Sequence, residues 1–176
     1  MAIAQVLPRR LVSWIAAEPD WDQVYAEHLP RVLNYFRYRL GATADVEELT
    51  ARTFEKAWRA RHRYRRDLSG FSTWLLTIAR HVAIDYLRVR RRHEPLEAAA
   101  VVPSPDHTPE QQAVRQSEAE RLADLLATLE PRQRDLIAMK YGADMTNRAI
   151  AYATGLSESN VGSILHRAVE TLRGRW

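Results

Sequence analysis

Hydrophobic residues recur every three to four positions over most of the chain, which is the spacing of an amphipathic α-helix. In residues 24–40 the apolar positions on one helical face are Val24, Leu29, Val32, Leu33, Phe36 and Leu40. Gly41 follows as a helix stop, and a second helix is predicted to begin near Asp45. Its apolar side carries Val46, Leu49, Thr53, Phe54, Ala57 and Trp58. No segment of useful length alternates as a half-buried strand does, so the predicted fold is all-α.

A third helix is predicted from Phe71 to Arg92, after a basic loop. Its core stripe is formed by Phe71, Trp74, Leu75, Ile78, Val82, Tyr86 and Val89. We interpret Trp74 and Ile78 as packing residues rather than as ligand contacts. The complementary surface is polar and carries Thr73, Thr77, Arg80, His81, Arg88 and Arg91. So many arginines on one helical face are compatible with the binding of successive phosphates.

The second half of the chain is also helical by its pattern. Apolar positions from Val114 to Leu129 predict a helix ending at Glu130, and Pro131 suits the first position of the next helix. That helix is predicted to stop at Gly142, and two more helices fit residues 146–176.

A proline-rich segment separates the two halves. Residues 93–110 hold four of the eight prolines and have no sustained apolar period. We interpret this segment as a flexible acidic linker between two small helical domains, residues 21–92 and residues 111–176. Residues 1–20 form an N-terminal segment to which the sequence assigns no role.

Charge is strongly segregated along the chain. Residues 52–92 carry 12 basic and 3 acidic side chains, residues 93–130 carry 2 and 8, and residues 131–176 carry 7 and 4. A block of one sign is usually a solvated face, but basic blocks interleaved with aromatic residues also indicate nucleic acid. In the loop Arg61–Arg66, Tyr64 lies among arginines, an arrangement that suits single strands better than duplex.

The last segment has the spacing of a helix-turn-helix. Ala151, Gly155 and Val161 supply a small residue, a turn glycine and a β-branched packing residue, and Ser157 is a natural N-cap for the second helix. The exposed side of that helix is predicted to carry Ser159, Asn160, Ser163, His166 and Arg167. All of these can bond to base edges or phosphates in a major groove. A helical hairpin with a polar face is the alternative interpretation.

Three ordered motifs make the sequence resemble the extracytoplasmic-function (ECF) sigma factors of bacterial RNA polymerase. They are DVEELTARTFEKAW, FSTWLLTIARHVAIDYLRVRRR, and the terminal helix-turn-helix followed by HRAVETLR. The resemblance covers roughly residues 21–175. It implies a first domain that binds core RNA polymerase and the −10 element of promoter DNA, a second domain that reads the −35 element, and control by an anti-sigma factor.

The resemblance also implies site residues. The polymerase-binding helix corresponds to Asp45, Glu48, Thr53 and Phe54, although Phe54 also fits a core position. The −10 site corresponds to the loop and helix residues Tyr64, Arg65, Arg66, Ser69, Thr77, Arg80, His81, Arg88 and Arg91. The −35 site corresponds to the groove-facing side of the last helix, with Asn160, Ser163 and Arg167 matching directly.

Several positions depart from the pattern of the family. Ala51 and Glu48 stand where glutamine and aspartate are usual, and His81 occupies a common asparagine position. Gly162 and Ile164 replace a typical lysine and arginine, so two phosphate contacts are missing from the recognition helix. Binding at the −35 element is therefore expected either to be weaker or to shift toward Arg148, His166 and Arg173.

The sequence gives little support for an enzyme. It has no cysteine, its six histidines lack metal-ligand spacing, and it has no phosphate-binding glycine loop or nucleophile motif. We therefore expect no catalytic residue, metal, cofactor or small-molecule substrate. No apolar run approaches the ~20 residues of a membrane span, and Arg9 and Arg10 lie where a signal peptide has its apolar centre. A cytoplasmic protein without membrane insertion is expected. The alternative function is a helix-turn-helix regulator that binds duplex operators without polymerase.

Overall fold

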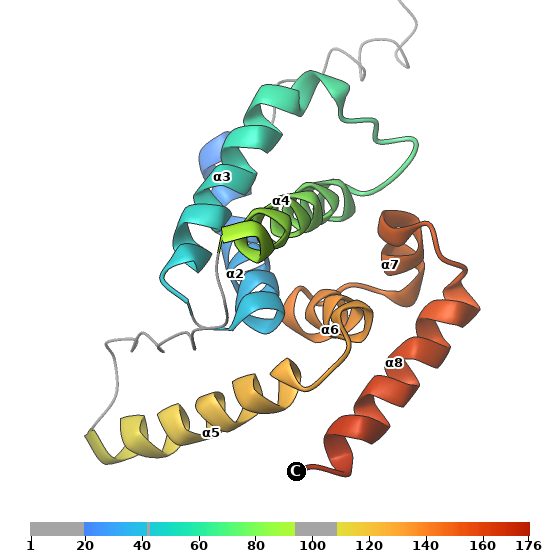
Figure 1. The fold of residues 1–176 in the computed structure, drawn as a ribbon. Coiled ribbons are helices and arrows are strands. Elements are labelled where there is room, and N and C mark those ends of the chain that lie inside the picture. Colours follow the sequence, from blue (N-terminus) through green and yellow to red (C-terminus); the bar gives the residue numbers. More distant parts are fainter. Residues whose placement is uncertain (1–19, 42, 94–108) are drawn as a thin grey trace, which may run out of the picture.

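The computed structural model describes residues 20–41, 43–93 and 109–176, and every regular element in these ranges is helical (Figure 1). The elements of the first half are α2 (Trp21–Leu40), α3 (Asp45–Ala60), the 3₁₀ turn η1 (Arg61–Arg63) and α4 (Phe71–His93). Those of the second half are α5 (Pro109–Ala127), α6 (Pro131–Ile137), the π-helical turn η2 (Ala138–Gly142), α7 (Asn147–Thr154) and α8 (Glu158–Arg173). The predicted all-α fold is confirmed.

Helix ends in the first half follow the predicted signals. The Asp20 carboxylate accepts a hydrogen bond from the Asp22 N–H at 3.1 Å and caps α2. Gly41 has φ of 87°, and its N–H donates to the Arg37 carbonyl at 2.9 Å. A left-handed φ is open to glycine because it lacks a Cβ, so the helix ends where the sequence predicted.

In the second half one boundary differs from its prediction. The helix expected to end at Glu130 ends at Ala127, where the Thr128 hydroxyl donates to the Leu125 carbonyl at 2.7 Å. Pro131 does open α6, and the chain continues through the π turn to Gly142, the predicted stop. The predicted linker, residues 93–110, lies mostly outside the described residues; His93 closes α4 and Pro109 opens α5.

The two halves share one continuous hydrophobic core. Helix α2 packs on η2 and α6, and α4 packs on α7, so α6 lies beside α2 in Figure 1 and α7 lies beside α4. The core runs from Val32 and Phe36 in α2 through Leu76 in α4 to Leu136 and Ile150 in the second half. A domain of about 70 residues buries only about 60% of its unfolded surface, so each half gains burial by packing on the other.

This packing changes which face of α4 is buried. Leu75 and Val82 of the predicted stripe are buried, but so are Leu76, Ala79 and Ala83 on its flank, while Val89 at the far end is 52% exposed. The prediction of this stripe from periodicity assumed that α4 packs against other helices on one side only. Helix α4 has α2 and α3 on one side and α7 on another, so its buried face is wider and is shifted toward the second half.

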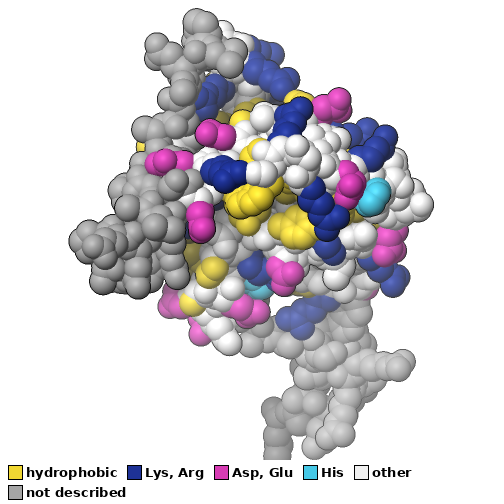
Figure 2. Space-filling model, turned by 90° about the horizontal axis from the view of Figure 1, so that it is seen from below, with side chains coloured by type: hydrophobic (Ala, Val, Ile, Leu, Met, Phe, Trp, Pro, Cys, Tyr) yellow, Lys and Arg dark blue, Asp and Glu magenta, His cyan; other side chains and the backbone are white. Residues whose placement is uncertain are grey.

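The face seen in Figure 2, which includes the side of α5, has mixed charge. Hydrophobic side chains gather in its middle, and basic and acidic side chains alternate around them. A surface on which positive and negative charges alternate lacks the uniformly positive potential that attracts a phosphate backbone.

Gly142 provides a test of the contact between the halves. A Cβ built on Gly142 would lie 2.9 Å from the Asn34 carbonyl oxygen and 3.2 Å from Tyr38 Cγ, both in α2. We expect Gly142→Ala to lower the free energy of unfolding by about 1–3 kcal/mol because the backbones must separate. Urea denaturation followed by circular dichroism measures the change.

Gly162→Ala is the matched control. Gly162 lies inside α8, and the nearest atom to its added Cβ is Asn147 Nδ2 at 3.8 Å. The alanine is expected to raise stability by about 0.5–1 kcal/mol through its helix propensity. Equal effects of the two substitutions would show that the close approach of η2 to α2 is absent in solution.

Candidate nucleic-acid interface

The loop before α4 is held inward by Tyr64. Its hydroxyl donates to the Ser69 carbonyl at 3.2 Å, and its ring centroid lies 5.3 Å from that of Phe71 and 5.2 Å from that of Trp74. Burial raises the pKa of the Tyr64 phenol. In this conformation Tyr64 therefore packs against α4 and fixes the loop, and its ring is not presented as an open stacking surface.

The basic side chains of the loop point to solvent. Arg65 is exposed and donates to both carboxylate oxygens of Asp67, with the shorter contact at 2.6 Å. Arg66 is exposed and Ser69 is half-buried. The predicted loop residues thus lie together before the N-terminus of α4, but one of their charges is already paired within the loop.

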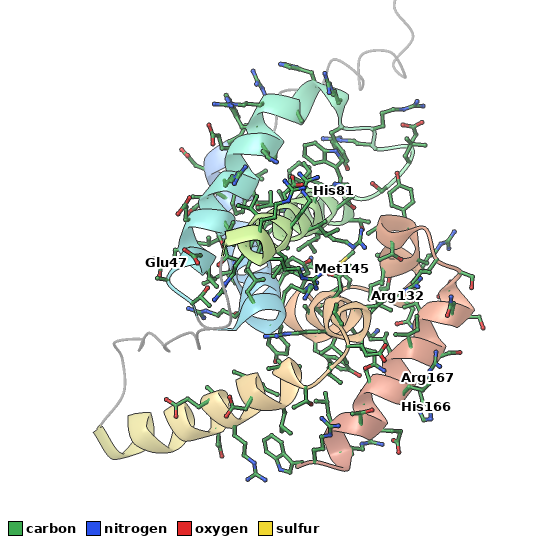
Figure 3. All side chains as sticks on the ribbon, viewed as in Figure 1. Glu47, His81, Arg132, Met145, His166 and Arg167 are labelled. Carbon is green, nitrogen blue, oxygen red and sulfur yellow. The ribbon has the colours of Figure 1, made fainter. Side chains whose placement is uncertain are left out.

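The predicted −10 residues of α4 lie on one polar stripe. The Thr77 hydroxyl donates to the Thr73 carbonyl at 2.8 Å, and Arg88 pairs with Asp85 at 3.3 Å. His81, labelled in Figure 3, is exposed, as are Arg88 and Arg91. Arg80 differs from the others because its Nε donates to Asp135 Oδ2, in the second half, at 2.8 Å. The stripe is therefore open at its ends and engaged at Arg80.

Asp135 is the centre of a buried polar cluster. Its Oδ1 accepts a hydrogen bond from the Tyr35 hydroxyl at 2.9 Å and lies 3.4 Å from Arg39 Nε, while Oδ2 accepts from Arg80. Asp135 is 5% exposed and Tyr35 is fully buried. Burial, reinforced by the adjacent carboxylate, raises the pKa of Tyr35 well above its usual value.

Sequence reasoning missed this cluster. Asp135 follows Arg80 by 55 residues and Tyr35 by 100 residues, so no local spacing connects them. The only signal was a carboxylate directly before the apolar run Leu136–Met139. A buried carboxylate requires partners, but periodicity cannot say which arginine supplies them.

The helix-turn-helix forms as predicted. Thr146 and Ser157 cap the two helices, with their hydroxyls accepting from the Ala149 N–H at 3.1 Å and the Asn160 N–H at 3.2 Å. Gly155 has φ of 72° and closes α7 through a bond from its N–H to the Ala151 carbonyl at 2.9 Å. Val161 is fully buried against the first helix.

The predicted −35 residues form one exposed face of α8. Ser159, Asn160, Ser163, His166 and Arg167 are all exposed, and Arg148 is exposed on α7. His166 and Arg167 project from the side of α8 turned away from α6 (Figure 3). The Ser163 hydroxyl donates to the Ser159 carbonyl at 3.1 Å, so its oxygen can still accept a hydrogen bond. Packing between the halves leaves this face uncovered.

The predicted polymerase-binding residues divide into two groups. Glu48 is exposed, and Asp45 accepts a hydrogen bond from the Tyr86 hydroxyl at 2.5 Å. Thr53 and Phe54 are buried, with the Thr53 hydroxyl bonded to the Leu49 carbonyl at 2.8 Å. These two lie on the inner face of α3 with the core, the alternative position expected for Phe54, and their contact with polymerase stays a prediction.

An aromatic surface at the far end of α3 was not predicted. Trp58 and Tyr25 are each 43% exposed, although periodicity placed Trp58 with the core. The Arg61 guanidinium lies 4.0 Å from the Trp58 ring centroid, and Trp21 packs edge-on to the same ring at 5.1 Å. Partly exposed aromatic residues beside an arginine are typical of protein interfaces.

The described residues contain no group of histidine and acidic side chains that could hold a metal ion. Among the same residues, no helix has the combination of length and apolar character that a membrane crossing needs.

Comparison with known families settles the identity of the fold. Residues 24–93 match Sigma-70 region 2, and residues 119–172 match Sigma-70, region 4. The ECF RNA polymerase sigma factor SigL of Mycobacterium tuberculosis is 32% identical over 156 residues, which cover 85% of each chain. The chain belongs to the ECF sigma factor family. Sigma factors are non-catalytic initiation factors that direct RNA polymerase to promoters.

Other ECF sigma factors are similar at lower identity. RpoE of Cereibacter sphaeroides is 29% identical, with 89% of this chain and 86% of RpoE covered. BldN of Streptomyces coelicolor is 27% identical, and the chain spans 61% of its length. The solved structure of CnrH in complex with the cytosolic domain of CnrY has the same fold. Its TM-score is 0.69 at 22% identity, with 93% of this sigma factor and 92% of CnrH covered.

Arg167 provides a test of the recognition face of this sigma factor. We expect Arg167→Gln to reduce the salt dependence of binding to −35 duplex DNA, because each lost phosphate contact lowers the slope of log K against log[salt] by about 0.9. Fluorescence anisotropy at several salt concentrations measures this slope. Arg37→Gln, an exposed arginine on α2, is the control and should leave the slope unchanged. Equal slopes for both variants would remove Arg167 from the phosphate contacts.

Proposed function

We propose that this sigma factor reads the −35 element as duplex through the exposed face of α8 and the −10 element as single strand through α4 and its preceding loop. The observation that carries the proposal is the capped helix-turn-helix whose polar face stays exposed, joined to a half whose longest helix carries a stripe of arginines. A recognition helix suits the major groove, and the arginine stripe suits phosphates.

The exposed side of α3 is the proposed contact with core polymerase. It presents Glu48 at one end and the Trp58 aromatic surface at the other, while the buried Thr53 and Phe54 support the helix from behind. In this arrangement Glu48 supplies charge and Trp58 supplies apolar area. Ala51 lies on the same exposed side, where a small residue leaves room for a partner helix.

Energetics assign strand opening to the complex rather than to this chain alone. Opening a duplex costs about 1.4 kcal/mol per stacked step, whereas stacking one base on an aromatic side chain returns about 1–3 kcal/mol. Capture of one or two bases therefore offsets one or two steps. The remaining steps require contacts from polymerase, so the sigma factor acts as the specificity subunit of a larger machine and carries no catalytic group of its own.

Control by an anti-sigma factor is the second part of the proposal. RpoE of Bartonella quintana, solved in complex with the anti-sigma factor NepR, has the same fold as this chain, with a TM-score of 0.70 at 21% identity and 89% and 96% of the two chains covered. A partner that covered the α3 surface would block polymerase binding. We also propose a cytoplasmic location, because the protein would act with polymerase on the chromosome.

Transcription in vitro tests the function directly. We expect core RNA polymerase with this protein to start transcription at discrete sites on fragmented genomic DNA of the source organism, with shared elements upstream. Sequencing of the transcript 5′ ends measures this. A helix-turn-helix regulator would instead bind duplex operators in the absence of polymerase and give no new starts.

A variant pair locates the polymerase contact in the same assay. Glu48→Arg should reduce specific transcripts roughly tenfold, which corresponds to about 1.4 kcal/mol of binding. Asp124→Arg, an equivalent charge reversal at an exposed position of α5, should leave them unchanged. Normal initiation by Glu48→Arg would exclude this side of α3.

A further inference from the structure

A cavity bordered by α4, α6 and α7 has three arginines and one carboxylate among its lining residues. Its volume is about 240 Å³, and the charged residues are Arg39, Arg80, Arg132 and Asp135. We propose that this cavity binds the phosphate group of a small-molecule ligand, with the three guanidinium groups as donors. The site goes beyond the reading of promoter elements, because its ligand is neither DNA nor protein and is bound without being converted.

Asp135 does not balance the positive charge of the cavity. Its Oδ2 accepts from Arg80 Nε at 2.8 Å, whereas Oδ1 accepts from the Tyr35 hydroxyl and lies 3.4 Å from Arg39 Nε. One carboxylate therefore faces two guanidinium groups, and Arg132 adds a third positive charge to the lining. A buried charge costs free energy unless it is paired and hydrogen-bonded. The excess of positive charge favours a ligand with one or two negative charges, as a phosphate group has.

Most guanidinium donors at the cavity have no acceptor in the part of the chain that the structure describes. Arg39 Nε is buried there without a hydrogen-bond partner. Within the same residues Arg80 donates through Nε alone, and Arg132 donates to no residue. Buried donors are nearly always paired, so an orphaned one indicates an acceptor that the chain does not supply. Arginine binds phosphate through two parallel N–H bonds, which suits the donors that remain.

The lining of the cavity is apolar as well as charged. Ile84 of α4, Leu136 of α6 and Leu156, which follows α7, contribute apolar side chains. The volume of about 240 Å³ is about eight times the ~30 Å³ that one water molecule occupies in the liquid, which is more room than a bare phosphate ion needs. Apolar walls with a few convergent polar groups are typical of small-molecule sites. We therefore expect an organic phosphate to bind more tightly than inorganic phosphate.

The three arginines differ in exposure, which gives the ligand a way in. The side chains of Arg39 and Arg80 are 11% and 23% exposed. Arg132, labelled in Figure 3, is exposed at the start of α6. A small anion can therefore meet Arg132 from solvent and reach the less exposed donors behind it. A cavity of about 240 Å³ is too small for a continuous strand of DNA or a peptide segment.

Occupation of this site has a consequence for the −10 contacts. Arg80 belongs to the proposed −10 site, so a ligand phosphate on its guanidinium would compete with a DNA phosphate for the same donors. This consequence rests on the proposed function, whereas the site itself does not. A test of the site therefore needs neither polymerase nor promoter DNA.

Isothermal titration calorimetry and thermal unfolding of the full chain test the site. The probes are inorganic phosphate, adenosine monophosphate and adenosine, each at an ionic strength matched with sodium chloride. We expect adenosine monophosphate to bind once per chain and, at ten times its Kd, to raise the midpoint of unfolding by roughly 3–6 °C. Adenosine should have no such effect. Tighter binding of adenosine monophosphate than of inorganic phosphate would identify an organic phosphate as the ligand, and equal binding would identify the free ion.

Two variants each remove one guanidinium group from the cavity. Arg39→Gln and Arg132→Gln should each weaken the binding of both phosphate probes about tenfold. Arg37→Gln, the same change at an exposed position of α2 outside the cavity, is the control and should bind as the wild type does. Circular dichroism checks folding. Arg132→Gln carries the test if Arg39→Gln does not fold, because Arg132 is exposed.

The outcomes separate the phosphate site from the proposed function. The site would be overturned by the absence of saturable binding of both phosphate probes, by equal binding of adenosine and its monophosphate, or by an Arg132→Gln variant that binds as Arg37→Gln does. Transcription by the wild type with core polymerase would still uphold the function in each case. Conversely, phosphate binding that depends on Arg132 upholds the site even if the wild type fails to initiate transcription.

Discussion

One carboxylate, buried where the two halves of the chain meet, determines how they pack. Asp135 lies between Arg39 and Arg80 and accepts the hydroxyl of Tyr35, so three side chains of the first half converge on one residue of the second. Removing one partner from a buried ion pair costs about 3–5 kcal/mol, because an uncompensated charge is left in a medium of low polarity. Helix α6 must therefore stay against α2 and α4 for as long as the charges stay buried, and α7 and α8 are positioned from α6.

The two proposed DNA surfaces differ in their contacts with the other half of the chain. The α8 face points away from the first half and is exposed, whereas Arg80 of the α4 stripe is bonded to Asp135 of the second half. Among the described residues, the proposed −35 face therefore has no contact with the first half, whereas the proposed −10 face has one at Arg80. The packing also keeps Arg80, a proposed phosphate contact, bonded to Asp135.

Local features of the fold could be predicted from the sequence, and contacts across the chain could not. Gly41, Gly155 and Ser157 act through neighbours within four residues, so their roles as helix ends and caps were visible in the sequence. The spacing of Ala151, Gly155 and Val161 likewise identified the helix-turn-helix. Asp135 acts on residues 55 and 100 positions away, where periodicity carries no information.

For the site residues, too, local sequence patterns predicted some positions and not others. Exposure of Asn160 and Arg167 followed from their helical phase, because α8 packs on the rest of the domain through one side. Tyr64 was predicted from composition as a stacking residue, but the Ser69 carbonyl and the Phe71 ring hold it inward. Thr53 and Phe54 were carried over by resemblance, and both are buried on α3. Helical phase therefore predicted exposure where a helix has a single packing side, whereas composition did not show how the loop holds the Tyr64 ring.

The most direct test of the shared core is a nuclear Overhauser measurement on the isotope-labelled free protein. The account predicts contacts between the Tyr35 ring protons and the Asp135 β protons, together with slow solvent exchange of the Arg80 Nε proton. Overhauser contacts confined within each half, with the Arg80 Nε proton exchanging as in an exposed arginine, would contradict it.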